Sequence, residues 1–244
     1  MNLYAGLYAI DAFDLTERLT MTLSGRLNIA DIKLQDFLGT SLNGSHDFAR
    51  FDPGAGFTYK LAQDATFYLG YSEANRAPTA GELSCANPAS PCLHDTFLVS
   101  DPALKQVVAR TYETGLRGAF DSAPLDGHIV WSLGVYRSDV ARDILLLATD
   151  VNGFGSFQNA GKTRHQGFDA SVGYQSEAWR VNLAYSFLDA TFRNALTLSS
   201  NSPAADASGL IVVHPGDTLP LMPRNRLTLG VDYAPSPGWT VGGA

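Results

Sequence analysis

The stretch LTMTLSGRLNI, residues 19–29, alternates apolar and polar side chains along its whole length. Its odd-numbered positions are apolar, with Gly25 as the exception, and its even-numbered positions are polar. Successive side chains of a β-strand point to opposite faces of the sheet, so this period of two predicts a strand with one apolar and one polar face. The segment from Leu19 to Ile32 also runs past the ~5–6 residues that are usual for strands of soluble proteins.

The same alternation recurs in other segments, which we expect to be strands as well. These segments are residues 67–71, 129–135, 168–174, 179–187 and 226–233. Aromatic residues stand near the segment ends, as in an interfacial girdle. A membrane-crossing strand needs roughly 9–11 residues, so the chain has room for about ten such strands with their loops.

The connections between these segments are expected to alternate between short and long. Short turns are expected at residues 15–18, 62–64, 176–178 and 235–238, with a looser one at 121–127. Long polar connections are expected at residues 33–46, 73–106, 143–157 and 194–224. Short turns on one side and long loops on the other are typical of outer-membrane barrels. We therefore predict an all-β fold, an antiparallel transmembrane β-barrel that is incomplete and forms a curved, open sheet.

A soluble β-sandwich is the alternative fold, and its loops would be shorter and would lack this sidedness. The two folds differ in the exposure of the apolar rows. A sandwich buries them and leaves the polar rows outside, whereas a membrane barrel turns them toward lipid and its polar rows toward a hydrated lumen. We assign the charged residues of the strands to the lumen, as inward rows that include Arg26, Asn28, Arg50, Asp52, Arg110, Glu113, Arg117, Asp169, Arg180 and Arg226.

Composition excludes several classes of protein. The formal net charge is −7 and the pI is about 5.1, which argues against nucleic-acid binding because that requires a basic face. The sequence has no apolar run of the length that a helical membrane span needs. Residues 1–14 lack the basic region of a signal peptide. Enzyme motifs for hydrolysis, zinc catalysis or phosphate binding are absent from the sequence, so we expect no enzyme and no cofactor.

Four short motifs resemble, in their order and spacing, the barrel of TonB-dependent receptors, the active-transport family of the Gram-negative outer membrane. They are YSEANRAPT at residues 71–79 with Glu82 and Leu83, YETGLRG at 112–118, NAG at 159–161 with GFD at 167–169, and PRNRL at 223–227. The resemblance covers roughly residues 45–244. Asp169 stands where the family usually has Glu.

This resemblance implies a 22-stranded barrel closed by an N-terminal plug. It also implies an outer-membrane receptor that binds and imports a scarce nutrient such as a ferric siderophore, energised through TonB. The expected partners are outer-membrane lipid, the TonB complex and a small-molecule iron chelate. No plug, TonB box or final strand is recognisable, so residues 1–244 are interpreted as a partial barrel domain. The functional alternatives are a passive porin-like or adhesin-like barrel and a soluble all-β binding domain.

The candidate ligand-binding residues lie at the rim of the predicted barrel. They are Arg76, Asn75, Glu82 and Glu113. Arg76 stands where a strand gives way to the longest loop, and its guanidinium could bind carboxylates or phosphates in bidentate fashion. The alternative role for Arg76 is an ion pair with Glu73, Glu82 or Glu113.

Cys85 and Cys92 are expected to form a disulfide, because both lie in one short stretch and the compartment is oxidising. The bond would close a small ring and, in the chain-entropy model, would stabilise the folded state by roughly 2.5 kcal/mol. A metal site with His94 is the weaker alternative, because no second cysteine pair is present. The group Asp150, Asn152 and Gly153 resembles a calcium loop only faintly, and we predict no metal.

Overall fold

The computed structural model describes residues 2–35, 37, 43–84, 92–93, 104–148, 154–199, 203–236 and 238–243. Within these residues, ten strands follow one another in one antiparallel sheet. They are β1 (Asn2–Asp14), β2 (Leu19–Leu34), β3 (Gly44–Ala62), β4 (Ala65–Arg76), β6 (Val107–Ser122), β7 (Gly127–Ala148), β8 (Phe154–Gln175), β9 (Trp179–Phe192), β12 (Asn225–Ser236) and β13 (Trp239–Gly243). Each of them pairs with its neighbours along the chain, which confirms the predicted antiparallel all-β fold.

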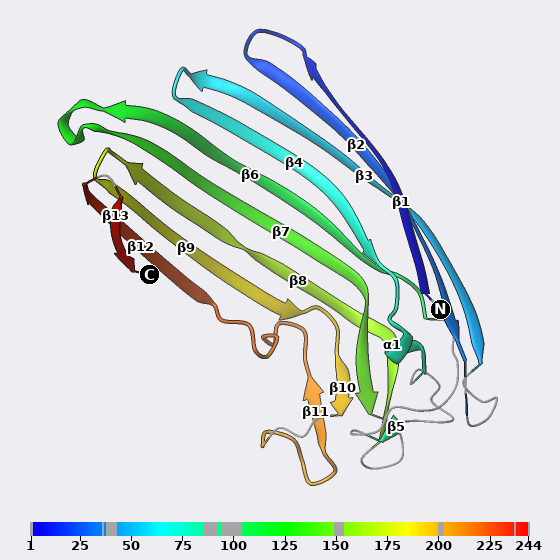
Figure 1. Cartoon of the computed structure of the whole chain (residues 1–244). Coiled ribbons are helices and arrows are strands. Elements are labelled where there is room, and N and C mark those ends of the chain that lie inside the picture. Colours follow the sequence, from blue (N-terminus) through cyan, green and yellow to red (C-terminus); the bar gives the residue numbers. More distant parts are fainter. Residues whose placement is uncertain are drawn as a thin grey trace.

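The sheet is curved and open, with its short turns at one end and its long connections at the other (Figure 1). In the described part of the chain, β1 pairs along one edge with β2, and β13 pairs along one edge with β12. The long-connection end also carries the helix α1 (Ala80–Ser84) and the short strands β5 (Cys92–Leu93), β10 (Leu196–Ser199) and β11 (Leu210–Val213). A 3-10 turn, η1 (Ala123–Leu125), joins β6 to β7 at the opposite end.

The long connections contain more regular structure than predicted. The prediction of a loop over residues 143–157 was wrong at both ends. The strand β7 continues to Ala148, and β8 already begins at Phe154. The expected loop at 194–224 contains the hairpin of β10 and β11, in which Leu196 lies opposite Val213. Leu198 also pairs with Leu147 of β7. The Ser- and Pro-rich composition of this connection concealed two apolar segments of four residues each.

One face of the sheet carries an apolar band made of residues that lie opposite one another on successive strands. Trp131 of β7 pairs with Val172 of β8, which pairs with Leu183 of β9. Val172 and Leu183 are 47% and 43% exposed, although each lies in the middle of a long strand. A sandwich would bury this face, so the exposed band supports the membrane barrel and argues against the soluble alternative.

The band is bounded by aromatic side chains on the side of the short turns. Trp179 stacks on Tyr233 there, with ring centroids 4.4 Å apart. Their strands are long enough for a tilted membrane crossing. Among the described residues, no helix has the length and apolarity of a membrane-spanning helix.

The main cluster of buried apolar residues is small and lies at the end that carries the long connections. It consists of Ile32, Leu83, Leu104, Val107 and Ile144, which come from α1, three strands and the segment that precedes β6. This cluster holds α1 against β2, β6 and β7, and thereby fixes the start of the longest connection.

Candidate ligand-binding rim

The passage from β4 to α1 forms a capping box, a reciprocal pair of hydrogen bonds at a helix N-terminus. The Thr79 hydroxyl accepts a hydrogen bond from the backbone N–H of Glu82 (3.2 Å), and the Glu82 carboxylate accepts one from the backbone N–H of Thr79 (2.7 Å). Pro78 is buried next to Thr79. Proline keeps the residue before it extended, so the strand ends and the helix begins within a few residues.

Arg76, the last residue of β4, clamps this capping box. Its two terminal nitrogens donate to the two oxygens of Glu82 at 2.7 and 3.0 Å. The side chain of Arg76 is 46% exposed and that of Glu82 is 14% exposed. The ion pair with Glu82, one of the predicted alternatives for Arg76, is therefore present. Ligand contact by Arg76 or Glu82 stays a prediction.

The charge state of Glu82 follows from its surroundings. Burial alone would raise the pKa of the Glu82 carboxyl, but hydrogen bonds from Arg76 and from the backbone of Thr79 outweigh that effect and hold the pKa below its ordinary value. An arginine side chain carries its positive charge throughout the ordinary pH range. Both groups are therefore charged near neutral pH, and the clamp is a charge-assisted, bidentate contact.

Asn75 belongs to a different polar cluster, at a place where two strands of the sheet separate. The pairing of β3 with β4 ends at Gly54 and Ser72 on the side of the long connections. There, Asn28 of β2 donates to Asn75 (2.7 Å) and to the buried Asp52 of β3 (2.8 Å). The separation between the strands is thus filled by hydrogen-bonded side chains.

This cluster continues through charged residues of three strands. Arg50 bonds to Asp52 (3.1 Å) and to Glu73, and Glu73 also accepts from Tyr71 (2.6 Å) and Arg110 (3.2 Å). Every carboxylate in the cluster therefore has a cationic or amide donor beside it, as buried polar groups require.

Gln106 completes the cluster, because Asn75 donates to it. Sequence reasoning did not single out Gln106. It lies in no alternating segment, and nothing in its immediate sequence distinguishes it from other polar loop residues.

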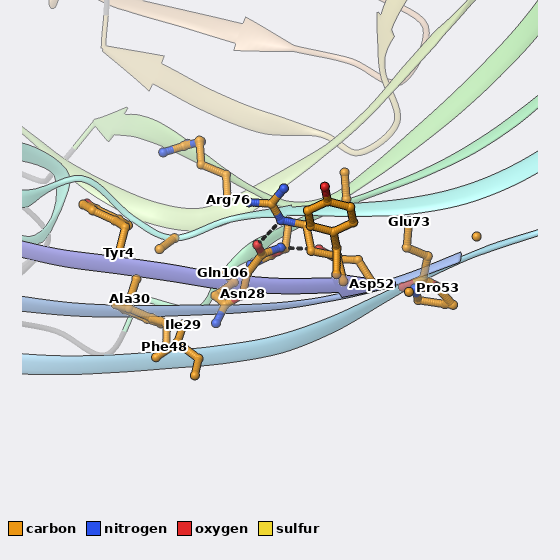
Figure 2. A pocket seen from close by; sticks show the side chains of 18 of the residues that line it. Tyr4, Asn28, Ile29, Ala30, Phe48, Asp52, Pro53, Glu73, Arg76 and Gln106 are labelled. Carbon is orange, nitrogen blue, oxygen red and sulfur yellow. Dashed lines mark hydrogen bonds between the residues drawn. The ribbon is translucent and has the colours of Figure 1, made fainter. Parts of the chain in front are cut away.

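A hollow of about 840 Å³ lies beside the cluster, within the range of small-molecule sites. Tyr4 and Tyr8 of β1, Arg26 and Asn28 of β2, and Arg76 contribute to its lining. Asn28, Asp52 and Gln106 gather near its middle in Figure 2. The hollow thus combines aromatic surface with two guanidinium groups.

Glu113 lies apart from the other candidate rim residues. It pairs with Gly70, six residues along β4 from Arg76, which is about 20 Å at the spacing of a strand. Glu113 therefore lies in the wall of the sheet and not at the rim, and its role in ligand binding stays a prediction.

Arg110 was wrongly placed in the same inward row as Glu113. The two residues are an odd number apart in an uninterrupted strand, so they face opposite sides of the sheet.

The predicted disulfide and the calcium-like loop lie outside the part of the chain that can be described. Cys85, the side chain of Cys92, His94 and residues 150–153 are not among the described residues. Within the described ranges, no group of three or more His, Cys, Asp or Glu side chains is arranged to hold a metal ion.

The sequence matches the family described as TonB dependent receptor-like, beta-barrel over residues 2–244. It is 22% identical to the probable TonB-dependent siderophore receptor PiuA of Acinetobacter baumannii, over 96% of this chain and 30% of the relative. Two solved structures are similar in fold. The ferric-catecholate import receptor Fiu of Escherichia coli K12 gives a TM-score of 0.67 at 19% identity, over 99% of this chain and 33% of that one. The ferripyoverdine receptor of Pseudomonas aeruginosa gives 0.68 at 16% identity, over 99% and 27%. The chain thus spans about a third of these proteins.

Proposed function

The chain belongs to the TonB-dependent receptor family, and from this premise we propose that it is part of the barrel wall of a receptor that imports a ferric siderophore. Proteins of this family lie in the outer membrane of Gram-negative bacteria, and the exposed apolar band fits that location. The family consists of transport receptors, and we assign the chain a transport role rather than a catalytic one.

We also propose that residues 1–244 are one part of a larger barrel domain. Further strands would complete the barrel, and a separate plug would close it. The chain spans about a third of its relatives, and β1 and β13 pair along one edge each in the described residues. TonB would act through the plug, so energy coupling is assigned to the complete receptor and not to this sheet.

The observation that carries the proposal is the hollow lined by aromatic and charged residues at the end of the sheet where the long connections lie. In an outer-membrane barrel this end faces the outside, because the short turns face the periplasm. Asn75 lies at the hollow, and the Arg76–Glu82 clamp fixes the start of the loop beside it. We propose that the hollow contacts the ligand and that the clamp shapes the loop next to it.

Uptake of radioactive iron tests the transport role. Two strains are compared with the wild type: one in which the gene for the complete receptor is deleted, and one that lacks TonB. Iron-starved cells of each strain are supplied with different ferric siderophores. The proposal predicts that uptake of at least one chelate is lost in both strains. Uptake that is lost on deletion but persists without TonB would favour a passive barrel. Unchanged uptake of every ferric siderophore in the deletion strain would contradict the proposal.

Binding by purified receptor tests the site. Asn75→Ala removes one acceptor group and one donor group from the hollow. It should raise the Kd of the transported chelate by roughly tenfold, since a lost hydrogen bond to a ligand costs about 1–1.5 kcal/mol. The control is Arg180→Gln, at the opposite end of the sheet beside the short turn of residues 176–178. Equal Kd values for Asn75→Ala and the unmodified receptor would show that Asn75 does not contribute to ligand binding.

A further inference from the structure

The hairpin of β7 and β8 turns over where it leaves the barrel wall. Within the wall, β7 pairs with β6 and β8 pairs with β9. Beyond the wall, each strand takes its partner from the other side: β8 pairs with β5, from the connection that precedes β6, and β7 pairs with β10, which follows β9. The ribbon formed by residues 143–148 and 154–159 is therefore turned over relative to the wall, and the two strands cross in Figure 1.

A bulge on each strand marks this crossing. The register of the hairpin slips on both strands here, which leaves Arg142 of β7 and Ala160 of β8 without an opposite residue. Arg142 has a φ of 59°, in the left-handed region that residues other than glycine seldom adopt. Bulges bend a strand and strengthen its local twist. The two bulges therefore account for the crossing at this point of the hairpin.

Asn159, the first residue of the NAG motif, joins the crossing to the segment that leads into β6. Its side-chain oxygen accepts a hydrogen bond from the backbone N–H of Lys105 (2.6 Å). Its amino group donates to the carbonyl oxygens of Lys105 (2.8 Å) and Arg142 (2.9 Å). An asparagine amide offers two N–H donors and one carbonyl acceptor. Each of these groups thus has a partner, and the side chain pairs with the backbone of Lys105 as a neighbouring strand would.

The residues on either side of Lys105 reach two different parts of the rim. Leu104 belongs to the buried apolar cluster. Gln106 lines the hollow and accepts a hydrogen bond from the side chain of Asn75. Because Gln106 directly follows the backbone that Asn159 holds, a shift of Lys105 would move the Gln106 side chain relative to the hollow.

We propose that Asn159 is a positioning residue for the hollow: it holds the backbone of Lys105 against the crossing of β7 and β8 and thereby places Gln106 beside Asn75. The inference rests on the proposed function, in which the hollow contacts the ligand. It adds a route by which the long connections act on the hollow. Beyond the wall, β5, β8, β7, β10 and β11 form a small rim sheet with strands from three different connections. A movement of this rim sheet would reach Gln106 through Asn159.

Amide hydrogen exchange in the complete, ligand-free receptor tests the positioning. Asn159→Ala removes all three hydrogen bonds, so residues 104–106 should exchange roughly tenfold faster. The matched control is Asn194→Ala, because Asn194 also accepts a backbone N–H of β8, that of Lys162 (2.7 Å), but stands at the start of a different connection. Unchanged exchange of residues 104–106 in Asn159→Ala would overturn the proposal, as would an equal increase in the control.

The Kd of the transported chelate tests whether Asn159 acts through Gln106. Asn159→Ala alone should raise the Kd roughly fivefold, whereas in a receptor that already carries Gln106→Ala it should change the Kd by less than about twofold. An equal increase in both backgrounds would mean that Asn159 does not act through Gln106, and the proposal would fail. If the unmodified receptor binds no ferric siderophore, the proposed function fails instead, and hydrogen exchange still decides whether Asn159 holds the segment that carries Gln106.

A third measurement needs no substitution, in case Asn159→Ala does not fold. Amide exchange of the unmodified receptor is followed at increasing concentrations of denaturant. Because Asn159 ties the two segments together, residues 104–106 and 157–161 should lose their protection at the same concentration. Loss of protection in residues 104–106 at a clearly lower concentration would contradict the proposal.

Discussion

Arg76 and Glu82 are joined by two hydrogen bonds of 2.7 and 3.0 Å, which tie the last residue of a membrane strand to the first turn of a short helix. The same carboxylate also caps that helix through Thr79. One side chain therefore performs two tasks, and substitutions can separate them. Glutamine keeps an oxygen for the cap but loses the charge, whereas alanine loses both.

We expect Glu82→Ala to lower the local stability of α1 by about 1–2 kcal/mol and Glu82→Gln to lower it by roughly half as much. The measurement is amide hydrogen exchange across residues 79–84 in the complete receptor. Glu113→Gln is the control, because Glu113 pairs with Gly70 far from α1. An equal effect of the glutamine and alanine variants would show that the cap contributes nothing beyond the ion pair.

The clamp should weaken in acid. Because the pKa of Glu82 in the folded state is lower than in the unfolded state, its contribution to stability is fully present above the unfolded pKa, about 4.3. That contribution is lost as the pH falls through the lower, folded-state pKa. The difference in exchange protection between the unmodified receptor and Glu82→Gln should therefore be constant from neutral pH to about pH 5 and vanish in stronger acid. A difference that grows on acidification would show that the sign is wrong.

Leu83 anchors the clamp to the sheet, since its side chain is completely buried against Ile32, Val107 and Ile144. Leu83→Ala should cost about 2–5 kcal/mol, through lost burial and the cavity that remains. Denaturant unfolding in detergent measures this cost. The control is Leu69→Ala on the lipid-facing side, which leaves no enclosed cavity and should cost less. A smaller loss for Leu83→Ala than for Leu69→Ala would mean that the cluster does not support the sheet.

Much of the fold could be predicted from the sequence because it rests on local patterns. The alternation from Leu19 onward and the turns at residues 15–18 and 176–178 depend only on neighbouring residues, and the structure confirms them. The capping box is also local, and it explains why Thr79 and Glu82 stand three residues apart. Pro78 marks the end of the strand for the same reason.

The remaining features depend on contacts between distant segments. The pairing of β3 with β4 ends at Gly54 and Ser72, and Asn28 meets Asn75 beyond that point. The two residues are 47 positions apart and lie on strands that are not neighbours, so they could not be paired from the sequence. The hairpin of β10 and β11 forms against β7, and its segments are too short to be recognised alone. Arg110 was assigned to the wrong face because charged residues were taken to point inward, whereas charges also occur outside the sheet above its apolar band.

The apolar band itself is tested by placing a charge at its middle. Leu183 lies halfway between Trp179 and Phe187, the two ends of the band on β9. Leu183→Arg should cost about 2–4 kcal/mol, because it exposes a guanidinium to hydrocarbon. Asn182→Arg, one residue away on the opposite face, should cost far less, since its side chain points to the hydrated side. The folded fraction of each variant in lipid vesicles is read from the heat-dependent shift of the barrel in gel electrophoresis. Equal loss for the two variants would mean that the two faces of β9 meet the same environment, and the assignment of the exposed band to lipid would then fail.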